Sequence, residues 1–591
     1  MAQTDRQLHP LSLSLISILI GAAAGLGAVG FRALIAIIHN LTFLGFFSVS
    51  YDANAHTPAS PWGPFVILVP VAGAIGVAFL VKNFAPEVKG HGVPEVMDAI
   101  YHEKGVIRPL VAAVKALASA LSIGTGGSVG REGPIIQIGA SFGSTLAQSL
   151  RLTLWQRITL VAAGAAGGIA ATFNTPVGGV LFAVEIMMHE VSVRTLVPVA
   201  IATATATYVG QLFFGPHPSF VIPVFEIPYF HVAKPLVLVC YLGLGMVMGI
   251  VSALFIWALY FAESFFEERV PGGYYVQHLV GMAVTGALMY GLMVGFGHYY
   301  VEGVGYSTIQ DILSSHPGPI YLLLILFAAK LIATSLTLGS GASGGIFSPA
   351  LYLGATLGAA YGIVLNRLLP GLGISPPAFA VVGMGAVVGA STSAAMAAIV
   401  MIFEMTLDYR VILPMTITVA TSYAVRKLLV KDSIYTRKIR LRGHDAPEAL
   451  HANVHFVQRA MEIMETDFKV APEIEPVVSF VKSVRNDDPA PLLLTGVDSQ
   501  ISGVVIRESG WPSPALAQGA LLKDVSGDYV IVRPEASFLE ILGSMRSAGQ
   551  SIALVSSKPG EKPALLTDVR GVVTEHRLIG SLAQTMELSS S

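Results

Sequence analysis

The sequence predicts an all-α membrane protein that ends in a smaller soluble α/β domain, and three observations lead to this fold class. The 591-residue chain is 53% hydrophobic and only 12% charged, whereas soluble domains carry about 25% charged residues. Apolar stretches with short polar breaks run from about Leu11 to Leu429, and ordinary polarity follows. This composition excludes an ordinary cytosolic enzyme. A net charge of -2 gives no basic field for nucleic acid.

The apolar stretches give the expected membrane helices. Several are too short to cross a hydrocarbon core of about 30 Å. Short segments broken by glycine survive at membrane depth only where protein or a water-filled cavity covers them, so the pattern favours a transporter or a channel. The expected helices cover residues 11–38, 64–82, 109–123, 135–150, 157–171, 177–188, 195–214, 234–262, 276–297, 318–337, 347–366, 378–389, 394–406 and 411–429.

The charge pattern sets the domain boundaries and the orientation. We expect a short cytoplasmic N-terminus at 1–10, a membrane domain at 11–443 and a cytoplasmic α/β domain at 447–591. Basic residues gather on the cytoplasmic side of membrane helices, which indicates a multi-pass protein of the cell (inner) membrane. The basic run after the last apolar helix consists of Arg426, Lys427, Lys431, Arg437, Lys438, Arg440 and Arg442.

The membrane domain contains an internal repeat, with halves at about 11–215 and 233–430. Twelve of the 31 residues in 113–143 are identical to the residue 215 positions later, including the pair Lys115 and Lys330. Shared glycine and alanine content does not explain matches of lysine and proline. Two repeat halves commonly meet at a midplane substrate site that is built from broken helices.

Two helix starts in the repeat predict an anion site. Residues 130–134 (GREGP) and 345–349 (GIFSP) each place a proline in the first turn of a helix after a glycine. Free N–H groups at a helix start, with the positive end of the helix dipole, bind anions. Glu132 within the bilayer is costly and therefore indicates function. Its carboxylate can fill the anion site itself, and protonation would let it leave.

These motifs resemble the chloride channel/transporter (CLC) family. The resemblance rests on GHGVP at 90–94, GREGP, GIFSP and SIY at 433–435, in this order over about three quarters of the chain. It implies inverted halves, a homodimer with one anion pathway per subunit, and Glu132 as external gate and proton carrier. No cofactor or metal is expected, and chloride is the expected ion. The expected anion-binding residues are His91, Gly130, Arg131, Gly133, Ile346, Phe347 and Tyr435.

The sequence departs from the family pattern at two positions. His91 stands where the family commonly has a serine whose hydroxyl contacts the anion, and Ile186 stands where proton-exchanging members carry an inner glutamate. His91 can donate an N–H to the anion, carry a charge beside it, or turn away to the backbone. The function is therefore either proton-coupled exchange of chloride or a similar small anion, or passive flow through a voltage- or pH-gated channel.

Two roles are possible for each of the other charged residues in the repeats of the membrane domain. Lys115 either raises the local potential for anions or extends to the membrane interface. Glu185 and Glu404 either carry protons or bind helix starts, and the second reading is favoured for Glu404. A remote alternative is an intramembrane serine protease, because residues 341–344 read GASG. That reaction would need a histidine such as His278 beside Ser343.

The C-terminal domain resembles a tandem pair of CBS domains. This resemblance rests on GVVI at 503–506 and GVVT at 571–574. Nucleotide-binding members often have a threonine at the end of this motif and an aspartate three residues later, where this chain has Ile506 in the first copy and Arg577 in the second. Binding of an adenine nucleotide is thus a hypothesis that these positions do not support.

Overall fold

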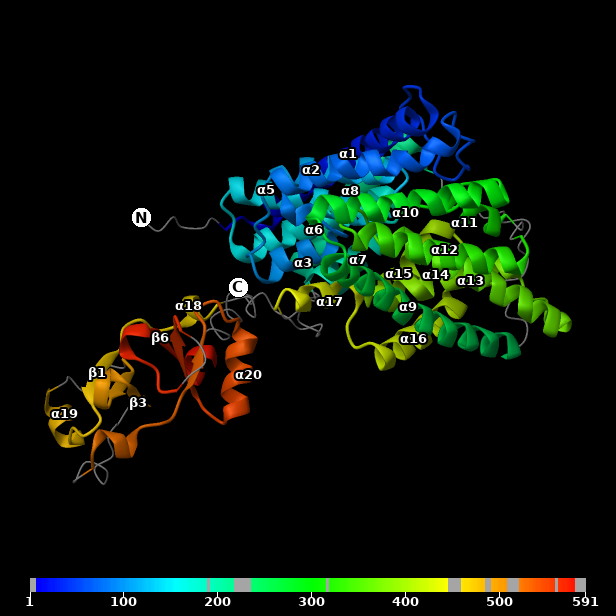
Figure 1. The fold of residues 1–591 in the computed structure, drawn as a ribbon. Coiled ribbons are helices and arrows are strands. Elements are labelled where there is room, and N and C mark those ends of the chain that lie inside the picture. The colour runs from blue at the N-terminus through cyan, green and yellow to red at the C-terminus, as the bar shows by residue number, and fades with distance from the viewer. Residues whose placement is uncertain are drawn as a thin grey trace. The chain divides into compact units, whose positions relative to one another are not determined.

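The computed structural model describes residues 7–188, 192–216, 235–314, 318–444, 459–483, 490–506, 520–558 and 562–579. The chain divides into two compact units, Met1–His451 and Ala452–Ser591 (Figure 1). The ends of the predicted domains at 1–6, 447–458 and 580–591 lie outside the described residues.

The regular elements of the first unit are helices, joined by loops, in the residues that the structure describes. Seven helices are long and apolar enough to cross a membrane, and four more apolar helices are shorter. The first half contains α1 (Pro10–His39), α2 (Leu68–Asn83), α3 (Val93–Tyr101), α4 (Leu110–Gly124), α5 (Glu132–Ser149), α6 (Leu154–Phe173), α7 (Pro176–Phe182) and α8 (Val193–Phe214). The second half contains α9 (Pro235–Arg269), α10 (Gly273–Phe296), α11 (Tyr306–Leu313), α12 (Ile320–Gly339), α13 (Phe347–Leu368), α14 (Pro376–Thr392), α15 (Ala395–Thr406), α16 (Ile412–Leu429) and α17 (Ile434–Leu441).

The predicted apolar segments coincide with helices, and the differences lie at short or polar elements. The helices α3, α11 and α17 were not predicted, because each has only eight or nine residues and includes polar side chains. The predicted segment 135–150 begins three residues late, since α5 already starts at Glu132. The predicted segment 234–262 ends early, because α9 continues through a charged end to Arg269. Residues 183–188 form a π-helical turn.

The two halves meet around a local two-fold axis. Gly130 and Gly345, which are equivalent in the repeat, exchange N–H to carbonyl hydrogen bonds of 2.7 and 2.6 Å in an antiparallel bridge. Around it the contacts are reciprocal: Ser119 with Ser343 at 2.8 Å, and Ser128 with Thr334 at 3.4 Å. An antiparallel contact between equivalent residues, with reciprocal contacts around it, is what a two-fold relation between the two halves produces.

Glycines let the central helices of each half cross closely. In the first half, a Cβ on Gly139 of α5 would overlap the carbonyl oxygen of Gly164 in α6. In the second half, a Cβ on Gly354 of α13 would overlap the carbonyl oxygen of Gly383 in α14. Small residues at helix crossings are how membrane helices gain close packing. The repeated glycines therefore fix α5 and α13, whose first turns carry the predicted anion site.

The second unit contains two small sheets of the same topology. The first has the order β1 (Lys469–Pro472), β2 (Leu492–Thr495) and β3 (Ile501–Val505), and the second β4 (Val530–Val532), β5 (Ile552–Ser556) and β6 (Val569–Thr574). In each sheet the first two strands pair in parallel and the last two antiparallel. The helices are α18 (Ala460–Ile463), α19 (Val477–Ser483) and α20 (Phe538–Ala548). The predicted GVV motifs fall on β3 and β6.

Candidate anion-binding site

Glu132, the first residue of α5, is fully buried. The hydroxyl of Tyr306 at the start of α11 donates a hydrogen bond to its Oε1, and Nε of Arg131 lies 4.0 Å from that oxygen. Tyr306 also contacts Oγ of Ser348 at 2.8 Å. Oε2 of Glu132 has no hydrogen-bond partner among the described residues. The carboxylate is thus held through one oxygen, and the other has no bond to break when the side chain moves.

The carboxylate of Glu132 lies beside the first turn of α13, from the other half of the repeat. A Cβ on Gly130 would overlap Oε2 of Glu132 and lie 3.1 Å from Oγ and 3.2 Å from N of Ser348. Gly130 therefore leaves the space in which the carboxylate approaches this helix start. The N–H groups there lack partners within the helix and carry the positive end of its dipole. A small anion would compete with the carboxylate for this space.

Ile346 and Phe347 sit at that helix start, as the N-cap and the first residue of α13. Both are buried, so their N–H groups lie inside the protein. Arg131 is the N-cap of α5, and its guanidinium lies over the ring of Tyr306 at 5.3 Å. The first turns of α5 and α13 are therefore adjacent, with one arginine beside Glu132.

His91 lies in the loop before α3 and is brought next to Tyr435. Both side chains are buried, and their ring centroids are 6.1 Å apart with an angle of 48° between the planes. Nδ1 of His91 has no hydrogen-bond partner in the described part of the chain. The carbonyl oxygen of His91 packs directly on Gly133, where a Cβ would overlap it. The loop of His91, the start of α5 and the start of α17 thus meet at one place.

A capping box fixes the first turn of α17 and with it Tyr435. Oγ of Ser433 accepts the N–H groups of Tyr435 and Thr436 at 3.3 and 3.2 Å, while Oγ1 of Thr436 accepts the N–H of Ser433 at 2.9 Å. The hydroxyl of Tyr260 on α9 donates to the carbonyl of Ile434 at 2.6 Å. The SIY motif therefore serves to hold the tyrosine ring at the end of the membrane domain.

A cavity of about 240 Å³ opens beside Tyr435. Arg426, Lys427 and Lys431 line it, together with Glu185 and Ile186. Three basic residues against one acidic residue give this cavity a positive potential, which raises the local concentration of anions. Basic residues that indicate the cytoplasmic side of the membrane domain thus also line an approach to Tyr435.

Lys115 and Lys330, the lysine pair of the repeat, are fully buried rather than extended to a membrane interface. Nζ of Lys115 donates to the carbonyls of Val88 and Gly90, both at 2.9 Å. Nζ of Lys330 donates to the carbonyl of Gly303 at 2.8 Å. Each ammonium group therefore holds the glycine loop of its own half and places a positive charge close to the meeting point of the two halves.

Glu185 and Glu404 form a reciprocal pair of helix caps. The carboxylate of Glu185 accepts the N–H groups of Met396 (3.0 Å) and Ala397 (2.7 Å) at the start of α15. The carboxylate of Glu404 accepts the N–H groups of Val177 (3.0 Å) and Gly178 (2.7 Å) at the start of α7. Both carboxylates satisfy helix N–H groups that would otherwise lack partners.

The serine of the GASG motif does not meet a histidine. Oγ of Ser343 contacts Oγ of Ser119 at 2.8 Å and donates to the carbonyl of Val88 at 3.0 Å. Nδ1 of His278 contacts Oγ of Ser340 instead, at 3.1 Å. The motif belongs to the contact between the two repeat halves, and no histidine of the described residues forms a hydrogen bond with Ser343.

Two residues of the site, Tyr306 and Ser348, were not predicted. Tyr306 follows the glycine loop 303–305, the second-half counterpart of residues 90–92. Ser348 lies within the GIFSP motif itself. Both residues lie in or next to repeated motifs. The sequence did not show that these residues of the second half would lie beside Glu132 of the first half.

Comparison with known proteins identifies the family. The profile described as voltage gated chloride channel matches residues 72–427. A ClcB-like protein of Ralstonia nicotianae is 33% identical over 72% of this chain and 97% of its own length. The H(+)/Cl(-) exchange transporter ClcA of Yersinia pseudotuberculosis is 32% identical over 73% of this chain and 88% of its own length.

Solved structures show the same fold. A slow cyanobacterial Cl-/H+ antiporter matches with a TM-score of 0.64 at 24% identity, over 74% of this chain and 99% of its own. A eukaryotic CLC transporter matches with a TM-score of 0.60 at 21% identity, over 96% of this chain and 98% of its own. The profile match over residues 72–427 and the relatives at 33% and 32% identity show that the chain belongs to the voltage-gated chloride channel (CLC) family.

Proposed function

We propose that the protein exchanges chloride for protons across the membrane, with Glu132 as the group that both closes the anion pathway and carries the proton. The observation that carries this proposal is the buried carboxylate beside the first turn of α13, held through one oxygen by Tyr306. An anion that displaces it would drive it out of the site, and protonation would stabilise the displaced form. The exchange activity in the name of the ClcA relative supports the same assignment.

The anion path that we propose runs from the basic cavity past Tyr435 and His91 to the start of α13. The N–H groups of Ile346 and Phe347 would hold the ion there without a full cationic ligand. Gly130 and Gly133 give room for this approach, and Arg131 and Lys115 raise the potential along it. Flux assays in liposomes test the substrate class: chloride should pass, whereas sodium and amino acids should not. Selective sodium or amino-acid flux would contradict the proposal.

A passive chloride channel is the second candidate, because of Ile186. This residue lines the cavity at the inner side of the pathway and cannot carry a proton. Its neighbour Glu185 is engaged with two backbone N–H groups. Proton coupling therefore needs water or another acid between the cavity and Glu132. His91, whose Nδ1 has no partner in the described residues, stands between them and is our proposed intermediate acceptor.

His91→Ser should preserve anion transport but shift its pH dependence and its preference between chloride and nitrate. Serine keeps a donor for the anion, whereas it removes the ring nitrogen Nδ1 that could accept a proton. Anion flux measured against pH in liposomes, with chloride or nitrate, checks this result. His298→Ser, beyond the end of α10, should keep the parental profile. If His91→Ser also keeps both the profile and the selectivity, His91 has a structural role.

Tyr435→Phe should weaken the binding of chloride while the ring contact with His91 is kept. A hydrogen bond to a charged group is worth about 1.5–3 kcal/mol, so chloride affinity should fall roughly 10- to 100-fold. Isothermal titration of the purified protein with chloride measures this change. Tyr361→Phe removes a hydroxyl that donates to the carbonyl of Cys240 at 3.2 Å and should leave affinity unchanged. Equal affinities in both variants would remove Tyr435 from the list of ligands.

We also propose the arrangement of the whole protein on the basis of its family. The protein would be a homodimer with one pathway per subunit in the cell (inner) membrane, and it would not act as an enzyme. The basic residues after α16 favour a cytoplasmic C-terminal unit. The matching topology of the two small sheets supports a tandem CBS-like pair. Arg577 follows the last strand of the second sheet and stands in the position of the ribose-binding aspartate. Its Nε lies 3.7 Å from Oε1 of Glu465. We therefore propose no nucleotide ligand.

A further inference from the structure

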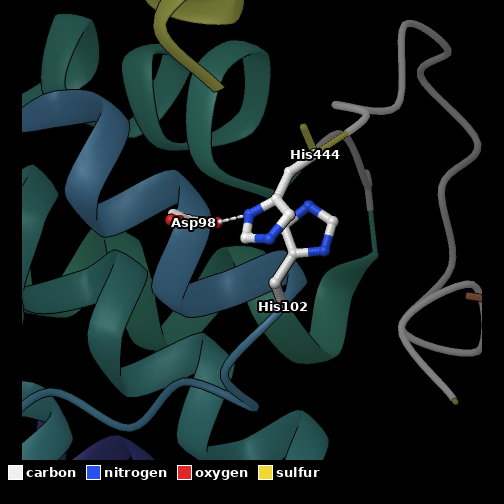
Figure 2. A group of neighbouring side chains, drawn as sticks. All are labelled: Asp98, His102 and His444. Carbon is white, nitrogen blue, oxygen red and sulfur yellow. Dashed lines mark hydrogen bonds and ion pairs between the residues drawn. The ribbon is translucent and has the colours of Figure 1, made fainter. Parts of the chain in front are cut away.

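Three potential metal ligands converge where α3 ends and α17 leads out of the membrane unit. Asp98 and His102 lie four residues apart on α3 and its C-terminal end, and His444 follows α17. Figure 2 shows the three side chains together, with the two imidazole rings face to face. The ring centroids are 4.4 Å apart, and Nδ1 of His444 lies 2.7 Å from Oδ1 of Asp98. One ligand atom from each residue lies within 4.8 Å of the others.

We propose that Asp98, His102 and His444 bind a divalent transition-metal ion of the zinc type. Two imidazoles and one carboxylate form a donor set that zinc uses in three-ligand sites with water in the fourth position. Ligand atoms of tetrahedral zinc lie about 3.3–3.6 Å apart, so the 2.7 Å contact between His444 and Asp98 would open and the stacked rings would rotate when an ion binds. The side chain of His444 is 43% exposed, which lets an ion reach the site from water.

The surroundings of the cluster fit this role. Oδ2 of Asp98 accepts a hydrogen bond from Nη1 of Arg442 at 3.3 Å, and outer partners of this kind orient metal-binding carboxylates. Arg442 is a cation that contacts the cluster, and its charge opposes metal binding. Its Nη2 donates to Oε1 of Glu95 at 2.6 Å. Two carboxylates therefore face one guanidinium, and Oδ1 of Asp98, which now contacts Nδ1 of His444 at 2.7 Å, is the oxygen that would turn to the ion.

A metal ion at this site would link the two helices that carry the rings of the proposed anion pathway. The helix α3 begins two residues after His91, and the first turn of α17 holds Tyr435. The ion would join their other ends, so it would restrict the movement of the His91 and Tyr435 rings relative to each other. We infer that the bound ion slows anion transport. This consequence rests on the proposed function, whereas the binding of the metal does not.

Metal binding is tested on the full-length protein in detergent after treatment with EDTA and its removal. Isothermal titration with zinc chloride should give one ion per chain, and cobalt(II) should give the absorption bands of a four- or five-coordinate site. His102→Ala and His444→Ala should each lower zinc affinity about 100-fold or more. His576→Ala, an exposed histidine of the second unit, should bind like the parent. Absence of zinc binding to the parent, or parental zinc affinity in both cluster variants, would overturn the site.

The effect on transport is tested in liposomes with zinc chloride on the side of the C-terminal unit. Anion flux should fall in the parent and in His576→Ala, and it should not change in His444→Ala. Stoichiometric zinc binding without a change in flux would leave the site in place and overturn the link to α3 and α17. Zinc binding by a protein that moves no anion at all would contradict the proposed function instead of the metal site.

Discussion

Glu132→Gln should abolish proton transport and leave anion transport in place. Glutamine has nearly the same shape as glutamate and can still accept the hydrogen bond of Tyr306, but it cannot exchange a proton. The side chain then has one charge state, so it no longer alternates between filling and leaving the space beside Gly130 in response to pH. In liposomes, proton flux driven by a chloride gradient should fall to the background of protein-free liposomes, while chloride flux continues.

Glu404→Gln provides the matched control for this change. Glu404 accepts the N–H groups of Val177 and Gly178, and a glutamine oxygen can keep one of these bonds. We therefore expect this variant to retain proton transport. A Glu132→Gln protein that still moves protons with the parental stoichiometry would contradict the assignment of Glu132.

Gly133→Ala should prevent correct assembly of the site and destabilise the membrane unit. A Cβ at this position would overlap the carbonyl oxygen of His91 and lie 3.1 Å from Cα of Gly345. Both neighbours are backbone atoms, so relief requires the start of α5, the His91 loop or the other repeat half to shift. Overpacking of this kind costs on the order of 3 kcal/mol. Size-exclusion chromatography after heating in detergent should show a lower midpoint for loss of the intact protein.

Gly291→Ala is the matched control, since no atom lies within 4 Å of a Cβ built on this residue of α10. It should leave the thermal midpoint and the chloride affinity unchanged. If Gly133→Ala matches this control in both measurements, the close approach of α5 to the His91 loop does not determine the site.

The arrangement of the long helices could be predicted from the sequence because apolar length and repeat identity report directly on it. The reciprocal bridge of Gly130 and Gly345 follows from their equivalence in the repeat. The short helices α3, α11 and α17 could not be predicted, because eight or nine residues with polar side chains carry no clear apolar pattern. Their positions depend on contacts between the two halves and not on local propensity.

The site could be predicted where the repeat or the family motifs indicated a residue, but the contacts between these residues could not. The glycine and proline motifs indicated the helix starts and Glu132, whereas the pairing of Tyr306 with Glu132 joins residues 174 positions apart. The meeting of His91 with Tyr435 likewise joins two motifs from opposite ends of the domain. No metal site was expected, since His444 lies more than 340 positions after Asp98 and His102 and meets them only through the packing of α3 and α17.

Proton movement driven by a chloride gradient tests the central claim most directly. Liposomes that contain the purified full-length protein are loaded with high chloride, at an internal pH below the external pH, and valinomycin with equal potassium holds the membrane potential at zero. Exchange of outgoing chloride for incoming protons predicts that protons enter against their own gradient, so the external pH rises. Dissipation of the chloride gradient, with potassium moving through valinomycin as the counter-ion and no proton entry above that of protein-free liposomes, would contradict exchange and show a passive channel.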